Sequence, residues 1–139
     1  MTQDKHYGNA ISGLNPTEIE VYHLDHLSAE TEFDMDIKVC QREGHFNNKV
    51  ALEYVVLGQN TDFRPHYHDQ SDALLLILRG CGYITDGAQR KYLIQEGSLA
   101  YIPAKTRHGF ITGDQQLHFI VLQSPPIKNL QSGEIDFVP

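Results

Sequence analysis

The sequence predicts an all-β domain, and three observations support this prediction. From Ile37 onward, apolar residues occur in short runs whose lengths suit strands. Each run is closed by residues that favour turns, as in all-β sandwiches and barrels. Helix signals are nearly absent from the same region. A single sandwich or barrel is therefore the expected architecture.

The expected strands follow one another along the chain. They are the runs IKVCQR, VALEYVVL, ALLLIL, GYIT, KYLI, SLAYI and LHFIVL, which begin at Ile37, Val50, Ala73, Gly82, Lys91, Ser98 and Leu117. Glycine, asparagine and aspartate tolerate the tight or positive-φ backbone of a reversal, so we place turns at residues 58–60, 86–87, 96–97 and 113–114.

Two of these runs predict how their strands are buried. Residues 74–78 are all apolar, so we expect both faces of that strand to be covered, as where two sheets pack or a barrel closes. The last run alternates, with Leu117, Phe119 and Val121 on one face and His118 on the other.

The chain of 139 residues fits one domain with a real core and is too short for two. Residues 1–36 are irregular, and we expect them to form an N-terminal arm that packs on the barrel or on a second subunit. The barrel itself is expected over residues 37–126, followed by a C-terminal tail over 127–139. No internal repeat is visible, so the barrel is a single copy.

Composition excludes several classes of function. The apolar share of 40% and charged share of 21% are ordinary for a globular protein, and no run approaches the roughly 18 apolar residues of a membrane span. The first residues are polar and acidic where a secretory signal needs a basic start and an apolar run, so we expect a soluble cytoplasmic protein. A net charge of -7 with scattered basic residues disfavours nucleic acid and anionic membranes as partners.

The two cysteines, Cys40 and Cys81, lack the spacing of a metal or redox motif, and we expect them to be reduced and packed in strands.

Three of the eight histidines form the strongest functional signal. His66 and His68 directly follow Pro65, and a spacing of two on an extended chain puts both imidazoles on one face, about 6.5–7 Å apart. His108 follows a second punctuated segment that begins at Gly97. The pair alone is a weak signal, but together with His108 it predicts a metal site.

These residues resemble the two motifs of the cupin superfamily, G-x5-HxH-x3,4-E-x6-G and G-x5-P-x-G-x2-H-x3-N. The likeness covers about residues 60–112, with compatible strands on both sides. The matching residues are His66, His68 and Gly80 in the first motif and Gly97, Pro103 and His108 in the second. The resemblance implies a double-stranded β-helix, also called a jelly-roll barrel, in a small single-domain cupin. It also implies a divalent metal held by the three histidines.

Several positions depart from the motifs. Asn60 replaces the first glycine, a benign change because asparagine tolerates the left-handed conformation. Lys105 and Thr112 replace the glycine and the asparagine of the second motif. The expected ligand glutamate is missing, because counting back from Gly80 leads to Ala73.

Asp72 fits the shorter permitted spacing from His68, but a one-residue offset on a strand reverses its face. We therefore keep Asp72 as a minor candidate ligand and expect a three-histidine site with open coordination positions. Neutral imidazoles suit iron, zinc, copper and nickel, and losing the carboxylate makes manganese less suitable. Fe(II) is the favoured metal.

Three hypotheses about function remain open. Within the family, three-histidine sites resemble those of thiol and β-diketone dioxygenases, so the leading hypothesis is an iron-dependent dioxygenase acting on a small organic substrate. The same metal could instead serve an isomerase, lyase or decarboxylase. The missing glutamate also allows a binding module without turnover. Many small cupins pair through N-terminal strands, which makes a homodimer a reasonable expectation.

For each of the remaining polar residues we compare a structural role with a functional one. Tyr101 and Asp72 are minor candidates for catalysis, although packing is the favoured role for Tyr101. Structural or surface roles are expected for the other five histidines, and His118 could also face the cavity. Three arginines flank the motifs and could bind an anionic substrate, but solvated charges at the rim are the favoured interpretation. These other histidines and arginines are His6, His23, His26, His45, His118, Arg64, Arg79 and Arg107.

Overall fold

The regular structure of the chain is almost entirely β, which confirms the predicted fold class. The computed structural model describes residues 18–32, 34–41, 46–129 and 132–139. Within these residues there are ten strands and two 3-10 helices. The helices are η1 (Leu24–His26) and η2 (Phe46–Asn48). The strands are β1 (Glu30–Glu32), β2 (Met35–Gln41), β3 (Ala51–Leu57), β4 (Asp62–His66), β5 (Asp72–Arg79), β6 (Cys81–Asp86), β7 (Lys91–Gln95), β8 (Leu99–Ile102), β9 (His108–Thr112) and β10 (Leu117–Ser124).

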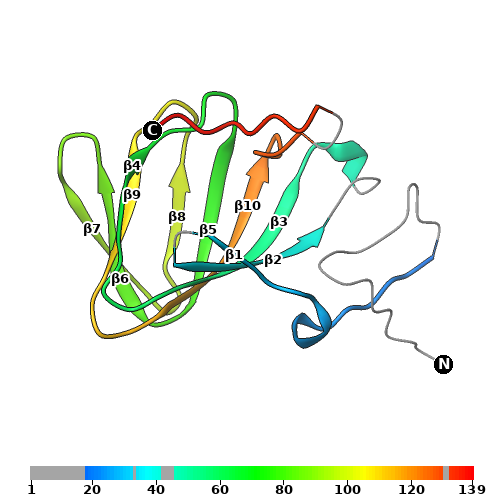
Figure 1. The fold of residues 1–139 in the computed structure, drawn as a ribbon, viewed down its shortest axis with the longest axis horizontal. Coiled ribbons are helices and arrows are strands. Elements are labelled where there is room, and N and C mark those ends of the chain that lie inside the picture. Colours follow the sequence, from blue (N-terminus) through cyan, green and yellow to red (C-terminus); the bar gives the residue numbers. More distant parts are fainter. Residues whose placement is uncertain (1–17, 33, 42–45, 130–131) are drawn as a thin grey trace.

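The strands form two antiparallel sheets that enclose one core. The larger sheet has the order β1-β2-β3-β10-β5-β8, and the smaller has the order β4-β9-β6-β7. Figure 1 shows the two sheets as opposite walls of one barrel. Buried side chains from both sheets meet between them, for example Leu75 and Ile77 from β5 with Ile84 from β6 and Phe110 from β9. This is the double-stranded β-helix that the motifs imply.

The seven runs predicted as strands correspond to β2, β3, β5, β6, β7, β8 and β10. Strands β1, β4 and β9 were not predicted. In β4 the apolar pattern is interrupted by Pro65, and in β9 it is interrupted by Gly109, so neither segment shows the alternation of a strand. These two strands nevertheless carry the site, because His66 ends β4 and His108 begins β9.

The expectation that both faces of residues 74–78 are covered is wrong for the described chain. On the inner face Leu75 and Ile77 are almost fully buried, whereas Leu74 and Leu76 on the outer face are 43% and 38% exposed. The inner face packs against the smaller sheet, and no described segment of the same chain covers the outer one. The predicted alternation of β10 is confirmed, since Leu117 and the two residues that share its face are buried.

Turn residues at the ends of strands have the conformations that their positions require. Asn60 has a φ of 53°, so asparagine does replace the motif glycine in a left-handed turn. Gly97 has a φ of 86°. Lys105, at the other substituted glycine, also has a positive φ of 65°, which a lysine adopts at a cost.

The end of the chain crosses one end of the barrel. In Figure 1 the red C-terminal segment passes from the side of β3 to the side of β4 and β9. It is attached there by an isolated bridge between Tyr67 and Val138.

None of the described helices has both the length and the apolar character needed to cross a membrane.

Candidate metal centre

The three predicted ligands come together where β4 and β9 lie side by side. His66 and His108 are directly opposite each other in the pairing of these strands. His68 lies two residues beyond His66, and the side chain of the intervening Tyr67 is on the other face. All three imidazoles are buried, with 5–8% of each residue exposed. The predicted convergence of the three side chains is therefore confirmed.

The close approach of β4 and β9 depends on the two residues that obscured the strands in the sequence. A Cβ atom at Gly109 would overlap the carbonyl oxygen of Phe63 and lie 3.0 Å from the nitrogen of Pro65. A residue with a side chain at position 109 would therefore push the strands apart. The pairing register also shifts between Phe63 and His66, in the stretch that contains Pro65, and this irregularity brings His66 opposite His108.

The imidazole rings surround a common point. Ring centroids are separated by 4.5 Å between His66 and His108, 5.0 Å between His66 and His68, and 5.3 Å between His68 and His108. One nitrogen from each ring lies within 4.8 Å of the other two. Among the described residues, these three histidines are the one group of potential ligands at such a spacing.

Hydrogen bonds to backbone carbonyls orient each ring. A carbonyl oxygen accepts only, so each Nδ1 carries the proton and the Nε2 lone pair is left for a ligand bond. The contacts are His66 Nδ1 to the Arg64 oxygen at 3.2 Å, His108 Nδ1 to the Thr106 oxygen at 2.9 Å and His68 Nδ1 to the Asp136 oxygen at 2.6 Å. These hydrogen bonds thus favour the tautomer that leaves Nε2 free for a metal.

Burial favours the neutral form of two of the rings. Desolvation, followed by the proximity of His108, lowers the pKa of His66 from 6.5 to about 4. Desolvation also lowers the pKa of His108, and the neighbouring His68 lowers it further. Neutral imidazoles are the form that binds metal. The donor set, its tautomers and its spacing therefore fit one divalent transition metal.

The predicted minor candidates lie apart from this group. The Asp72 carboxylate accepts a hydrogen bond from the Ala104 backbone N–H at 2.8 Å, so its contact is with the loop before His108. Ala73 is buried and faces the barrel interior, at the position that a ligand glutamate would occupy. The side chain of Tyr101 is 63% exposed on the outer face of β8, so the favoured role in core packing is wrong. It is exposed because the neighbouring Ile102 takes the inward position.

One polar pair inside the barrel was missed in the sequence. Glu53 on β3 and Gln123 on β10 are hydrogen-bonded at 3.2 Å, and Gln123 is opposite Ala73 in the pairing of β10 with β5. Burial raises the pKa of Glu53 despite the hydrogen bond from Gln123. The signal in the sequence was a lone glutamate in the apolar run VALEYVVL. A carboxyl group with a raised pKa is suited to proton transfer.

The other histidines and arginines lie outside the group of ligands. His118 is on the outer face of β10 and shares a 2.8 Å hydrogen bond with the Tyr54 hydroxyl, so it does not face the cavity. The side chains of His23 and His26 are exposed, as are the three arginines near the motifs. His6 and His45 lie outside the described residues.

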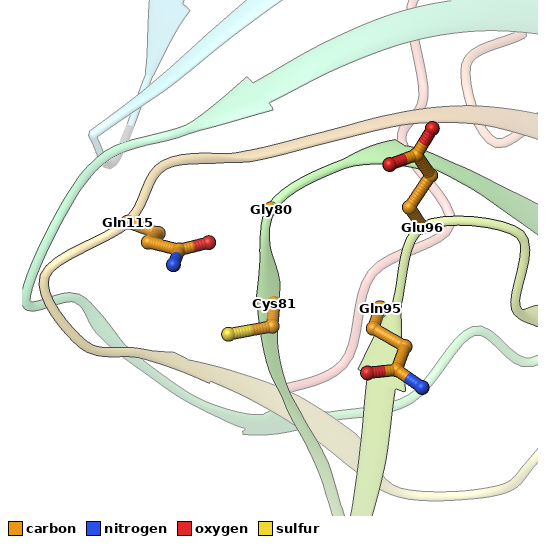
Figure 2. A pocket seen from close by; sticks show the side chains of 5 residues that line it. All are labelled: Gly80, Cys81, Gln95, Glu96 and Gln115. Atoms are coloured by element: carbon orange, nitrogen blue, oxygen red, sulfur yellow. The ribbon is translucent and has the colours of Figure 1, made fainter.

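A hollow lies at the opposite end of β5 from the histidines. Figure 2 shows the residues around it, where the side chains of Gln95 and Glu96 point away from the Cys81 thiol. Its lining consists of Gly80, Cys81, Gln95, Glu96 and Gln115. These side chains do not form one of the potential ligand groups of the described chain. The candidate site is therefore the three histidines.

Comparison with known proteins supports the same architecture. The sequence model of the family described as Cupin domain matches residues 53–123, about half of the chain. No curated protein sequence matches significantly.

Solved structures share the fold at low sequence identity. The polyketide cyclase RemF from Streptomyces resistomycificus superposes with a TM-score of 0.70 at 20% identity, covering 78% of this chain and 81% of that one. A predicted oxalate decarboxylase from Thermotoga maritima has a TM-score of 0.68 at 16% identity, covering 75% and 97%. The DMSP lyase DddQ from Ruegeria pomeroyi has a TM-score of 0.63 at 14% identity, covering 73% of this chain and 58% of that one.

Proposed function

Because the chain belongs to the cupin family, we propose that it is a metal-dependent enzyme acting on a small organic substrate inside the barrel. The observation that carries this proposal is the orientation of the three imidazoles. His66, His68 and His108 each have Nδ1 held by a carbonyl, so three Nε2 atoms remain for one ion. Three protein ligands leave coordination positions for substrate.

The favoured metal is Fe(II), with zinc, nickel, copper or manganese as alternatives. The three neutral ligands add no negative charge, which favours the borderline metals over manganese. When bound, the metal would polarise a substrate oxygen or hold dioxygen beside the substrate. The protein would supply the orientation of the ligands and a largely apolar wall that excludes water.

The more specific proposal is a dioxygenase, and it has a direct test. Protein purified without chelator or nickel affinity resin is analysed for metal and then screened for oxygen uptake with thiols and β-diketones. The expected result is stoichiometric iron and oxygen uptake with one substrate class, both lost in His108→Ala. Stoichiometric iron without oxygen uptake from any of these substrates would contradict the dioxygenase proposal.

A non-redox reaction is the second candidate, and the polar pair of Glu53 and Gln123 favours it. A buried carboxyl group with a raised pKa is suited to exchanging a proton with substrate. Proton transfer of this kind would suit an isomerase, lyase or decarboxylase, and the similar structures include a cyclase, a lyase and a predicted decarboxylase. Under this candidate, Glu53→Gln lowers kcat by about 100-fold without changing metal content. An unchanged kcat would exclude Glu53 as the proton-transfer group.

A binding module without turnover is the third candidate, because Ala73 stands where a fourth ligand would lie. Titration of the metal-free protein with divalent metals separates this candidate from the enzymes. A Kd weaker than about 1 mM, near -4 kcal/mol, would favour a metal-free binder.

We also propose that the protein is a homodimer that pairs through the outer face of the larger sheet. This outer face carries exposed apolar side chains on adjacent strands β8, β5 and β10. They are Leu74, Leu76, Leu78, Leu99, Tyr101 and Leu122. A contiguous apolar surface of this kind is typical of an interface. Sedimentation is expected to show a dimer for the native chain and a monomer for Leu76→Lys, and a monomeric native chain would refute the proposal.

A further inference from the structure

We propose that the C-terminal segment, residues 135–139, is an integral part of the metal site and that Asp136 is the residue that positions His68. This inference rests on the proposed metal-binding function. It concerns a part of the chain that neither cupin motif includes. Four sets of contacts support it.

The first contact is the hydrogen bond that orients His68. Each of the other two ligands uses the carbonyl two residues before it, so its orientation is determined locally. His68 instead donates from Nδ1 to the main-chain oxygen of Asp136, 68 residues further along the chain, at 2.6 Å. Its tautomer and ring orientation therefore depend on the C-terminal segment being in place.

The second set of contacts is made by the Asp136 carboxylate. It accepts hydrogen bonds from the backbone N–H groups of Asp69, Gln70 and Ser71 at 2.6, 2.8 and 3.1 Å. These three residues directly follow His68. The carboxylate thus ties the main chain on one side of the ligand, while the carbonyl of the same residue holds its ring.

The third set is the pairing of Val138 with Tyr67, the residue between His66 at the end of β4 and His68 just beyond it. Val138 N–H donates to the Tyr67 oxygen at 2.8 Å, and Tyr67 N–H donates to the Val138 oxygen at 2.9 Å. Further along, the Arg107 guanidinium donates to the oxygen of Pro139 at 3.3 Å. The segment is consequently held on the C-terminal side of Asp136 and Phe137.

The fourth contact is made by Phe137. Its ring stacks on the His66 imidazole with centroids 4.5 Å apart and planes inclined by 22°, and it meets His68 edge-on at 6.1 Å. Figure 1 shows the segment crossing the end of the barrel and finishing beside β4 and β9. One short segment therefore contacts two of the three ligands and the chain between them.

Removing the Asp136 side chain would release the three N–H groups and weaken the placement of the carbonyl. His68 would then lose its oriented tautomer, although the imidazole itself would remain. Loss of such a supporting contact typically lowers metal affinity by about 10–100-fold. Metal affinity is therefore the direct measure of the inference, independent of any catalytic assay.

The experiment compares full-length Asp136→Ala, Asp136→Asn and Glu134→Ala with the native chain. Glu134→Ala is the matched control because it removes an exposed carboxylate from the same part of the chain. Metal-free protein is titrated with Co(II) and followed by visible absorption. Proton NMR detects the hydrogen-bonded Nδ1–H of His68, and thermal unfolding establishes that each variant is folded.

Asp136→Ala is expected to bind Co(II) about 10–100-fold more weakly and to lose the protected Nδ1–H signal of His68. Asp136→Asn, which keeps an acceptor oxygen, is expected to bind with intermediate affinity, and Glu134→Ala within about threefold of the native chain. A folded Asp136→Ala protein with native Co(II) affinity would overturn the inference and leave the metal site intact. If the native chain itself binds no metal, the proposed function fails instead.

Discussion

Burial of His66 makes the stability of the metal-free protein depend on pH in a defined direction. The folded protein lowers the pKa of His66 from 6.5 to about 4, chiefly by desolvation. In the unfolded chain the same imidazole keeps its ordinary value near 6.5. Between these two pH values the unfolded state binds a proton that the folded state does not. The contribution of His66 to stability is therefore fully present above about pH 6.5 and is lost as the pH falls toward 4.

The magnitude follows from the size of the shift. One pKa unit corresponds to about 1.4 kcal/mol, so a shift from 6.5 to about 4 corresponds to about 3 kcal/mol over the full range. Between pH 7 and pH 4.5 the loss from this group alone is about 2 kcal/mol. Because His66 is almost fully buried, solvent screening reduces this figure little.

Urea unfolding of metal-free protein at pH 7 and pH 4.5 measures the effect. His66→Gln removes the titrating group, so its free energy of unfolding should fall by about 2 kcal/mol less between the two pH values than that of the native chain. His26→Gln, which removes a solvent-exposed histidine, is the control for losing one imidazole. If the native chain and His66→Gln lose the same free energy, burial of His66 does not penalise its charged form and our reasoning is refuted.

Three further predictions test the fold and the site. Lys105→Gly relieves the strain of a φ of 65° and should raise the free energy of unfolding by about 0.5–1 kcal/mol. Lys105→Ala should give no gain. A glycine variant less stable than the native chain would contradict this prediction. Leu75→Ala in the core should cost about 2–5 kcal/mol in urea unfolding, and Leu74→Ala on the outer face should cost clearly less; equal losses would show that both faces are packed. Ala73→Glu places a carboxylate inside the barrel, so it should destabilise the metal-free chain. It should also strengthen Mn(II) binding as measured by calorimetry. Unchanged Mn(II) affinity would mean that position 73 does not reach the site.

The candidate site was predictable in part because the spacing of its histidines in the sequence identifies them as ligands. His66 and His68 share a face through the period of two in an extended chain, and the position of Asn60 in a left-handed turn followed from its side chain. Strands β4 and β9, which carry His66 and His108, were not predictable from pattern. Their hydrophobic periodicity is broken by Pro65 and Gly109, and the reason for each break is a close approach between strands.

The all-β class, the alternation of β10 and the three candidate ligands could be predicted from the amino-acid sequence, because each depends on residues close together in the chain or on a motif with fixed spacing. The tertiary fold is needed to know which residues from distant strands meet. It put Glu53 beside Gln123, and it brought Asp136 to His68 across 68 residues. It also left one face of β5 exposed. Contacts of this kind depend on sheet order and register, which local patterns do not encode.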